Sequence, residues 1–154
     1  MSSIVIANFL CLDGPDGKVD ILDGATDTLL DTVTVGNIFL LGVAINPSTR
    51  KVYICSASTP SLLYVLNAGS RQVTAAVPIG QFAYNVDVDP LSNEVFVTDS
   101  FSNTVVVVDG RNNKVRATVP TTGGFPLGVA ANPVTRAVYV TEFDSGLVDI
   151  LTER

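Results

Sequence analysis

Short runs of apolar residues, each ended by turn-forming residues, follow one another along the chain. The clearest stretch, residues 85–126, reads NVDVDP, LSNEVFVTDS, FSNTVVVVDG, RNNKVRATVP and TTGGFP, and it contains four such runs. Runs of this length, separated by Gly, Pro, Asn and Asp at intervals of about eight to twelve residues, are typical of short β-strands. Because no helical periodicity interrupts them, the sequence predicts an all-β fold.

The four-run unit recurs at a fixed spacing of 43 residues. Asp89-Pro90 is matched by Asn46-Pro47 before it and by Asn132-Pro133 after it, and Val95-Phe96-Val97 is matched by Val52-Tyr53-Ile54 and Val138-Tyr139-Val140. A period of about 40–45 residues with four strands per unit is the signature of a β-propeller blade. The sequence therefore predicts a β-propeller of four-stranded antiparallel blades, with about 3.5 repeats at residues 3–36, 42–80, 85–123 and 128–154 of one domain, 1–154.

The two ends of the chain do not fit a closed ring. The first unit begins at a second strand, in SIVIANF, and the last unit stops at a third strand, in LVDIL, so the expected strands number three, four, four and three per unit. Unpaired apolar edges of this kind template association with another chain. We therefore expect a homo-oligomer, a dimer or larger, in which another copy completes the ring; the alternative is that the residues belong to a longer array.

The turns within each unit differ in chemistry. Pro47, Pro90 and Pro133 follow the first strand of their units, where a fixed φ favours a tight hairpin. Gly24, Gly69 and Gly110 lie between the third and fourth strands, and we expect positive φ at these glycines.

Composition narrows the class of protein. Apolar residues make up 47% of the chain and charged residues 16%, which excludes a disordered chain and predicts strands buried on both faces. The formal net charge of −6 argues against nucleic acid as a partner, since phosphate binding needs a basic face. No apolar run reaches the roughly 18–20 residues of a membrane-spanning helix, so no membrane span is expected.

The first residues, MSSIVIANFLCLDGPDG, lack the basic region and the cleavage site of a signal peptide. This predicts a cytoplasmic location if the chain is full length, and an extracellular or cell-surface location if it is a fragment of a longer protein. Cys11 and Cys55 fall at or just after the same strand position of successive units, which adjacent blades would hold apart. We expect both to be free thiols.

Three segments carry a resemblance to a known family: NPSTRKVYI, NPVTRAVYVTEFDSGLVDIL and SNTVVVVDGRNNKVRATVPTTGGFPLGVA. They resemble the YVTN-type β-propeller repeat, which pairs an NP-x-T-x-x-VYV hairpin with a V-x-V-[IV]-D strand. The resemblance covers essentially the whole chain and implies the propeller fold. Similar repeats occur in surface-layer-like proteins, adhesive ectodomains and lactonase-like enzymes, so the resemblance leaves the function open.

Alternate connections in a propeller lie on opposite faces, and this rule separates the residues by chemistry. Loops that join second to third strands, or one unit to the next, share one face. Six of the seven phenylalanines fall on or beside it, and three carboxylates accompany them: Phe9, Phe39, Phe82, Phe101, Phe125, Phe143, Asp99, Glu142 and Asp144. At equivalent repeat positions the sequence favours rings that fold inward and seal the blade ends; the alternative is a binding face for a protein or small-molecule partner.

Catalytic patterns are scarce. The chain has no histidine, which excludes Ser-His and Cys-His nucleophile systems and imidazole metal sites. Asp99, Glu142 and Asp144 remain as acid–base groups or as oxygen ligands for a hard cation such as Ca²⁺. No catalytic residue, metal ligand or cofactor is assigned. The sequence favours a non-enzymatic binding module that self-associates, with a lactonase-like hydrolase carrying a carboxylate-lined channel site as the alternative.

Overall fold

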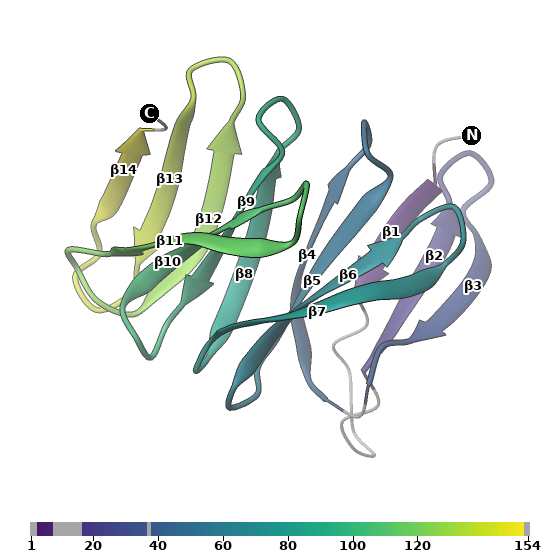
Figure 1. Cartoon of the computed structure of the whole chain (residues 1–154), viewed down its shortest axis with the longest axis horizontal. Helices are drawn as coiled ribbons and strands as arrows, with labels where there is room; N and C mark the ends of the chain where they lie inside the picture. The colour runs from purple at the N-terminus through teal and green to yellow at the C-terminus, as the bar shows by residue number, and fades with distance from the viewer. Residues whose placement is uncertain (1–2, 8–16, 37, 153–154) are drawn as a thin grey trace.

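A computed structural model describes residues 3–7, 17–36 and 38–152, and these residues form β-strands joined by turns and loops (Figure 1). The all-β prediction is confirmed. Among these residues no helix is long and apolar enough to cross a membrane.

The strands form four antiparallel sheets, numbered here in chain order. Sheet 1 holds β1 (Ser3–Ala7), β2 (Lys18–Asp23) and β3 (Thr28–Thr34). Sheet 2 holds β4 (Leu40–Asn46), β5 (Lys51–Ser56), β6 (Ser61–Asn67) and β7 (Gln72–Gly80). Sheet 3 holds β8 (Ala83–Asp89), β9 (Glu94–Asp99), β10 (Thr104–Asp109) and β11 (Lys114–Pro120). Sheet 4 holds β12 (Pro126–Asn132), β13 (Ala137–Glu142) and β14 (Val148–Thr152).

Strands follow chain order within every sheet, and the sheets follow one another in an arc (Figure 1). The first strands β4, β8 and β12 pack side by side, whereas the fourth strands β7 and β11 cross the front of the view in Figure 1. Sheet 1 stands at one end of the arc and sheet 4 at the other. Every sheet pairs its strands as consecutive hairpins, which is the arrangement predicted for propeller blades.

Apolar side chains fill the spaces between successive sheets. The core between sheets 2 and 3 contains Tyr53, Leu63 and Val65 of sheet 2, facing Val95, Val97, Val106 and Val108 of sheet 3. Phe96, Val105 and Val107 point from the other face of sheet 3 toward Val129, Val138 and Val140 of sheet 4. Val19 and Ile21 of sheet 1 pack on Val52 and Ile54 of sheet 2 in the same manner. Both faces of sheets 2 and 3 are therefore buried, as near-continuous apolar runs require.

The fourth strands differ from the strands inside the blades. Most residues of β3, β7 and β11 are exposed or half-buried, and these strands carry the free outer edge of their sheets. Thr and charged residues at such an edge discourage pairing with other chains.

Side-chain hydrogen bonds close the hairpin turns between first and second strands. Asn46, Asp89 and Asn132, at the 43-residue spacing, each accept a hydrogen bond at Oδ1 from the backbone N–H two residues later, at 3.0, 2.7 and 2.9 Å. These Asx turns close the hairpins that the Asn-Pro and Asp-Pro pairs predicted.

The prediction of positive φ at Gly24, Gly69 and Gly110 is wrong. The turns between third and fourth strands place positive φ at their last residue, which is Asp27, Arg71 and Asn113, with φ of 55°, 57° and 57°. Gly110 is instead required for space, because a Cβ there would lie 2.5 Å from the Tyr53 hydroxyl oxygen and 2.7 Å from the Asn93 carbonyl oxygen.

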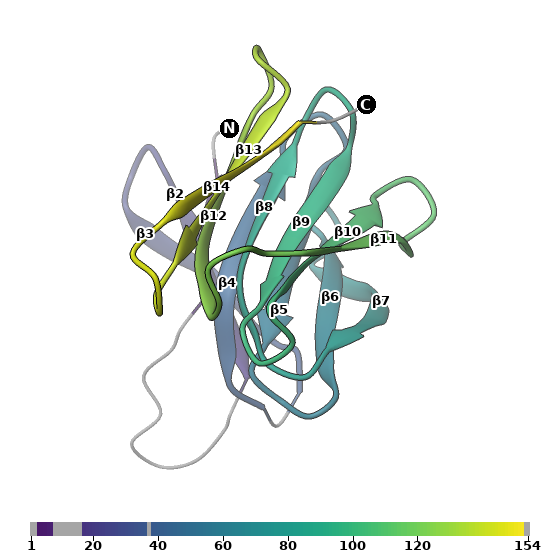
Figure 2. The same ribbon diagram turned by 90° about the vertical axis from the view of Figure 1, so that its left-hand side faces the viewer.

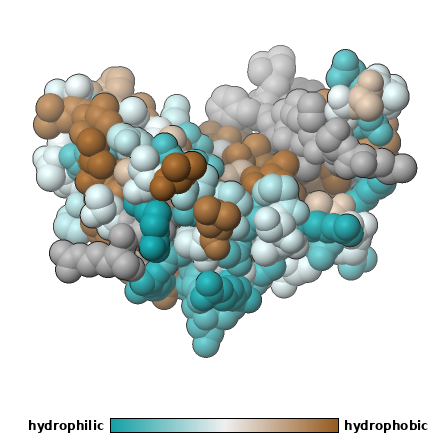
Figure 3. All heavy atoms as spheres, turned by 90° about the horizontal axis from the view of Figure 1, so that it is seen from above, coloured by the Kyte–Doolittle hydropathy of each residue, from teal (hydrophilic) through white to brown (hydrophobic). Residues whose placement is uncertain are grey.

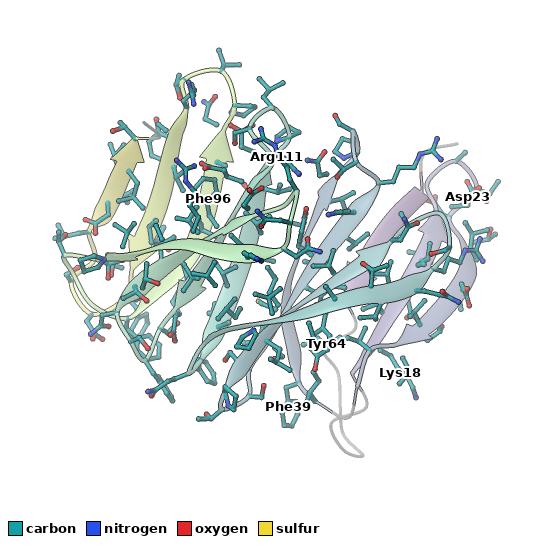
Figure 4. All side chains as sticks on the ribbon, viewed as in Figure 1. Lys18, Asp23, Phe39, Tyr64, Phe96 and Arg111 are labelled. Carbon is teal, nitrogen blue, oxygen red and sulfur yellow. The ribbon has the colours of Figure 1, made fainter. Side chains whose placement is uncertain are left out.

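The connections divide between two faces. The turn face carries the hairpin turns at residues 47–50, 68–71, 90–93, 110–113 and 133–136, and the loop face carries the connections at 57–60, 81–82, 100–103, 121–125 and 143–147. Figure 4 shows Arg111 at the turn face, at the top of the view, and Phe39 at the loop face, at the bottom.

The packing between sheets predicts which phenylalanine matters for stability. Phe96 is 3% exposed between sheets 3 and 4, so Phe96→Ala is expected to cost about 3–5 kcal/mol of unfolding free energy. Phe101 is 59% exposed, and Phe101→Ala is the matched control, expected to lose only the ring contacts of about 0.5–1.5 kcal/mol. Urea unfolding of both variants measures the difference, and equal losses would contradict the assigned packing.

Candidate functional site

Four phenylalanines form a continuous row on the loop face of sheets 3 and 4. Phe82 and Phe101 are stacked with ring centroids 4.6 Å apart, Phe101 and Phe125 are 6.0 Å apart, and Phe125 and Phe143 are 6.1 Å apart with their rings edge to face. We call Phe82, Phe101, Phe125 and Phe143 the phenylalanine row. Stacked and edge-to-face contacts are the favourable geometries for aromatic pairs.

The row is a surface feature, since Phe101 is 59% and Phe143 is 70% exposed, while Phe82 and Phe125 are half-buried. The two predicted alternatives therefore apply to different rings: Phe82 and Phe125 are partly enclosed, and Phe101 and Phe143 face solvent. Phe39 is 47% exposed at the loop face of sheet 2 and is not part of the row (Figure 4). Phe9 lies outside the described residues.

Backbone hydrogen bonds set the position of the row. Phe39, Phe82 and Phe125 occupy one repeat position, and each carbonyl accepts a hydrogen bond from the N–H of Ala57, Ser100 and Phe143 respectively, at 2.9, 2.9 and 3.1 Å. The Phe125 N–H also donates to Asn103 Oδ1 at 2.7 Å, which ties the loop of sheet 4 to that of sheet 3. The row breaks at sheet 2 because the positions matching Phe101 and Phe143 hold Ser58 and Ala57.

Asp99 has a structural role in the loop beneath the row. It is 2% exposed, and its carboxylate accepts hydrogen bonds from the N–H groups of Gln81 and Phe82, at 3.1 and 2.9 Å. These bonds satisfy backbone donors where the chain passes from sheet 2 to sheet 3, and they fix the first ring of the row. Asp99 is therefore an anchor for the loop and does not face the solvent with Phe101.

Glycine makes room for this anchor. A Cβ on Gly80, whose φ is 142°, would collide with the Asp99 carboxylate, and a Cβ on Gly123 would lie 2.8 Å from Glu142 Cβ. Gly80 and Gly123 are 43 residues apart, as are Asp99 and Glu142. This pair of spacings is visible in the sequence: a glycine at the end of the second and third units recurs with an acid in the unit that follows.

Glu142 occupies the Asp99 position of sheet 4 but lacks its hydrogen bonds. The residue is 2% exposed, and neither carboxylate oxygen has a well-formed hydrogen bond within the described part of the chain. Burial raises the pKa of the Glu142 carboxyl, and the nearby Asp149 and Asp144 carboxylates raise the pKa further. The Thr121 side chain and the Gly124 backbone lie close enough to oppose part of this shift.

Asp144 is exposed beside Phe143, and its N–H reaches the Gly124 carbonyl at 3.4 Å. Asp149 lies on β14 and accepts hydrogen bonds from the backbone N–H and the hydroxyl of Thr122, at 2.8 and 2.5 Å. Asp99 belongs to sheet 3 and Glu142 and Asp144 to sheet 4, and no three His, Cys, Asp or Glu side chains within the described ranges form a group suited to a metal ion.

The turn face of sheets 3 and 4 carries arginines, in contrast to the carboxylates of the loop face. A cavity of about 380 Å³ on the turn face is lined by Ser92, Glu94, Asp109, Arg111, Arg116 and Arg136. Arg116 forms an ion pair with Glu94, and the Arg111 guanidinium donates to the Ser92 carbonyl at 3.4 Å. Arginines are therefore grouped at the turn face, whereas Asp144 and Asp149 accompany the phenylalanine row.

The outer face of sheet 4 is an apolar surface, whereas the sequence predicted an unpaired apolar edge at this end of the chain. Tyr139, Val148 and Ile150 are 39%, 56% and 62% exposed there, and we call this face the open flank. Figure 2 looks onto sheet 4 with β13 and β14 in front, and in Figure 3 apolar side chains gather at the left end, where Figure 1 places sheet 4.

Cys55 is a free, fully buried thiol whose sulfur accepts a hydrogen bond from the Gly42 N–H at 3.2 Å. Burial raises the pKa of Cys55 to about 12, so the thiol stays protonated and unreactive. Cys11 lies outside the described residues.

Comparison with solved structures identifies the fold. The chain is similar to a hydrazine synthase from Kuenenia stuttgartiensis, with a TM-score of 0.81 at 16% identity over 94% of this chain and 48% of that one. It is also similar to a chain of a mitotic checkpoint complex, with a TM-score of 0.76 at 18% identity over 91% of this chain and 44% of that one. Both neighbours have β-propeller or WD40-type folds.

The chain therefore spans about half the length of the solved chains that it matches. No family model matches the sequence, and no curated protein matches it. The likeness supports a propeller-type, all-β fold of four-stranded antiparallel sheets, which the structure also has.

The environment of Glu142 predicts how stability depends on pH. A carboxyl whose pKa is raised on folding binds its proton more tightly in the folded state, so ionising it as the pH rises through its raised pKa destabilises the protein. Glu142→Gln removes that charge and is expected to raise the melting temperature at pH 7, with a gain that shrinks as the pH falls toward about 4, where the carboxyl is protonated in both states. Thermal unfolding across this range measures the gain. A Glu142→Gln variant that is less stable than the parent at pH 7 would contradict a raised pKa at this carboxyl.

Proposed function

We propose that this protein is a non-enzymatic interaction module of the β-propeller type that self-associates, so that a second copy continues the succession of sheets. The module also presents the phenylalanine row to a partner. The open flank of sheet 4 is the observation that carries self-association, because the chain itself provides three internal references for that surface.

Equivalent positions in the four sheets can be identified from the strand register. The third strands β2, β6 and β10 carry Val19 and Ile21, Leu63 and Val65, and Val105 and Val107 at the positions that β14 fills with Val148 and Ile150. The pairs on β2, β6 and β10 are at most 8% exposed, whereas Val148 and Ile150 on β14 are 56% and 62% exposed. The positions stay apolar in sheet 4 although no further sheet among the described residues covers them.

The second strands give the same result. Tyr53 and Phe96 are 0% and 3% exposed because the next sheet covers them, and the equivalent Tyr139 is 39% exposed. An apolar surface that matches the buried interfaces between sheets of the same chain favours a partner that resembles the next sheet. A second copy offers such a sheet.

In this arrangement the open flank of sheet 4 in one copy packs on sheet 1 of the second copy, on the face of sheet 1 that is turned away from sheet 2. This face includes Leu22 on β2 and Thr32 on β3, whose hydroxyl donates to Asp20 Oδ1 at 2.7 Å. Hydrogen-bonded polar groups at this side can be buried at little cost. The first strand β1 and the last strand β14 each pair on one edge only among the described strands, so a second copy also meets a free edge at each end of the chain.

Apolar area is the larger driving force for this contact. Removing apolar surface from water contributes roughly 25 cal/mol per Å², and a sheet-sized flank buries on the order of several hundred Å² per partner. Backbone groups on a free edge are already hydrated in water, so pairing them adds less.

Self-association is tested by light scattering coupled to size exclusion. The expected mass is a multiple of 16.2 kDa at micromolar concentration. The double variant Val148→Asp/Ile150→Asp places two charges on the open flank and is expected to give the monomer mass with an unchanged far-ultraviolet circular dichroism spectrum.

Two further variants locate the contact. Thr32→Arg, on the open side of sheet 1, is expected to weaken the assembly as well, whereas Val134→Asp, at an 87% exposed position of the turn face, is the control and is expected to leave the mass unchanged. A parent protein that remains a folded monomer at high micromolar concentration would refute self-association.

A lactonase-like hydrolase is the second candidate, and the buried Glu142 beside Asp144 and Asp149 is the feature that favours it. A carboxyl with a raised pKa next to other carboxylates resembles the acid–base pairs of hydrolases. The interaction module predicts no lactone hydrolysis above background, with or without Ca²⁺. Activity that is lost in Glu142→Gln would favour the enzyme instead.

A further inference from the structure

The phenylalanine row combines two properties that together select a class of ligand. Its outer rings, Phe101 and Phe143, are more than half exposed, so they offer aromatic surface to a partner. Carboxylates accompany the row at the sheet 4 end: Asp144 follows Phe143 in the chain, and Asp149 is hydrogen-bonded to Thr122 in the loop that carries Phe125. Aromatic faces and carboxylates both attract cations.

The basic residues of sheets 3 and 4 lie away from the row. Arg111 and Arg136 belong to hairpin turns of the turn face, Lys114 begins β11 beside one of those turns, and Arg116 pairs with Glu94 at the start of β9. No lysine or arginine among the described residues lies in the loops of these two sheets at the row. The carboxylates there are therefore not neutralised by a neighbouring cation of the same loops.

Glu142 adds a second, independent observation. The residue is 2% exposed, its carboxyl lies next to Gly124, the residue before Phe125, and neither oxygen has a well-formed hydrogen bond within the described ranges. A buried acid at the base of the row increases the negative potential under Phe125 and Phe143 whenever it is ionised.

We propose that the phenylalanine row binds an arginine-bearing, extended segment of a partner protein, with guanidinium groups stacked on the exposed rings and attracted by Asp144 and Asp149. Arginine fits better than lysine because its planar, weakly hydrated guanidinium stacks on aromatic faces. This inference rests on the row being a binding surface and does not depend on self-association.

The spacing of the rings matches an extended chain. Successive steps from Phe101 to Phe125 and from Phe125 to Phe143 measure 6.0 and 6.1 Å. Side chains on one face of an extended strand are two residues apart, or roughly 6.6 Å. A peptide with arginine at every second position therefore brings one guanidinium near each successive ring.

The test is a titration with three capped octapeptides that alternate glycine with arginine, lysine or glutamate, followed by fluorescence anisotropy at about 50 mM salt. The arginine peptide is expected to bind several-fold more tightly than the lysine peptide of equal charge, and the glutamate peptide is expected not to bind. Equal binding of the arginine and lysine peptides would overturn the proposal, because it would show charge attraction without stacking.

Variants assign the binding to the row. Phe101→Leu/Phe143→Leu keeps apolar bulk but removes two aromatic faces, and it is expected to weaken the arginine peptide about five- to thirtyfold. Asp144→Asn is expected to weaken it about two- to fivefold. Leu91→Ala/Val134→Ala is the matched control on the turn face, at positions 76% and 87% exposed, and should leave binding unchanged.

Folding and assembly are controlled separately. The melting temperature of each variant checks that the fold is intact, and the titration is repeated in Val148→Asp/Ile150→Asp, where the same affinity is expected. Unchanged binding in a folded Phe101→Leu/Phe143→Leu protein would overturn the proposal whatever the oligomeric state is. A loss of binding confined to the open-flank variant would also overturn it, because the peptide site would then lie at the contact between copies.

Discussion

Face-to-face packing of apolar strands is the interaction on which the other features depend. Each inner sheet places one set of side chains toward the preceding sheet and the alternate set toward the next, as Val95 and Phe96 do on β9. Two buried faces per sheet require strands that are mainly apolar, so the arginines lie in turns and fourth strands, and the acids inside the strands, such as Asp99 and Glu142, lie near strand ends. Side chains of different kinds are thereby separated between two faces, with arginines at the turn face and phenylalanines at the loop face.

The sequence predicted the repeating architecture well because its signals are local. Turn residues end the strands, and the 43-residue spacing aligns Asn46, Asp89 and Asn132, whose side chains close equivalent hairpins. The position of positive φ was predicted wrongly, because the αL residue of these turns is the last one and glycine at 110 serves close packing against Tyr53. Local sequence cannot distinguish a glycine needed for φ from one needed for space.

The candidate site could be predicted only in part. Assignment of loops to faces brought Phe82, Phe101, Phe125 and Phe143 to one end, but ring contacts depend on loop conformation, which the Asn103 side chain and backbone bonds fix. Composition does not reveal that the two carboxylates differ. Asp99 accepts hydrogen bonds from two backbone N–H groups, whereas Glu142, one methylene longer, has no well-formed hydrogen bond within the described part of the chain. The open flank could not be predicted from sequence, because its residues are as apolar as the equivalent buried residues of the other sheets and differ from them only in exposure.

An arc in which sheets contact their neighbours in succession has a consequence for how the molecule opens. Stability in such stacks is a sum of unit terms and nearest-neighbour terms, so units with one neighbour are held less firmly than units with two. Local opening should begin at sheets 1 and 4 and spread inward, and backbone amides of β9 should be the last to exchange with solvent. Covering the end sheets, by whatever partner, would therefore slow exchange far from the contact, which makes amide protection a remote indicator of occupancy.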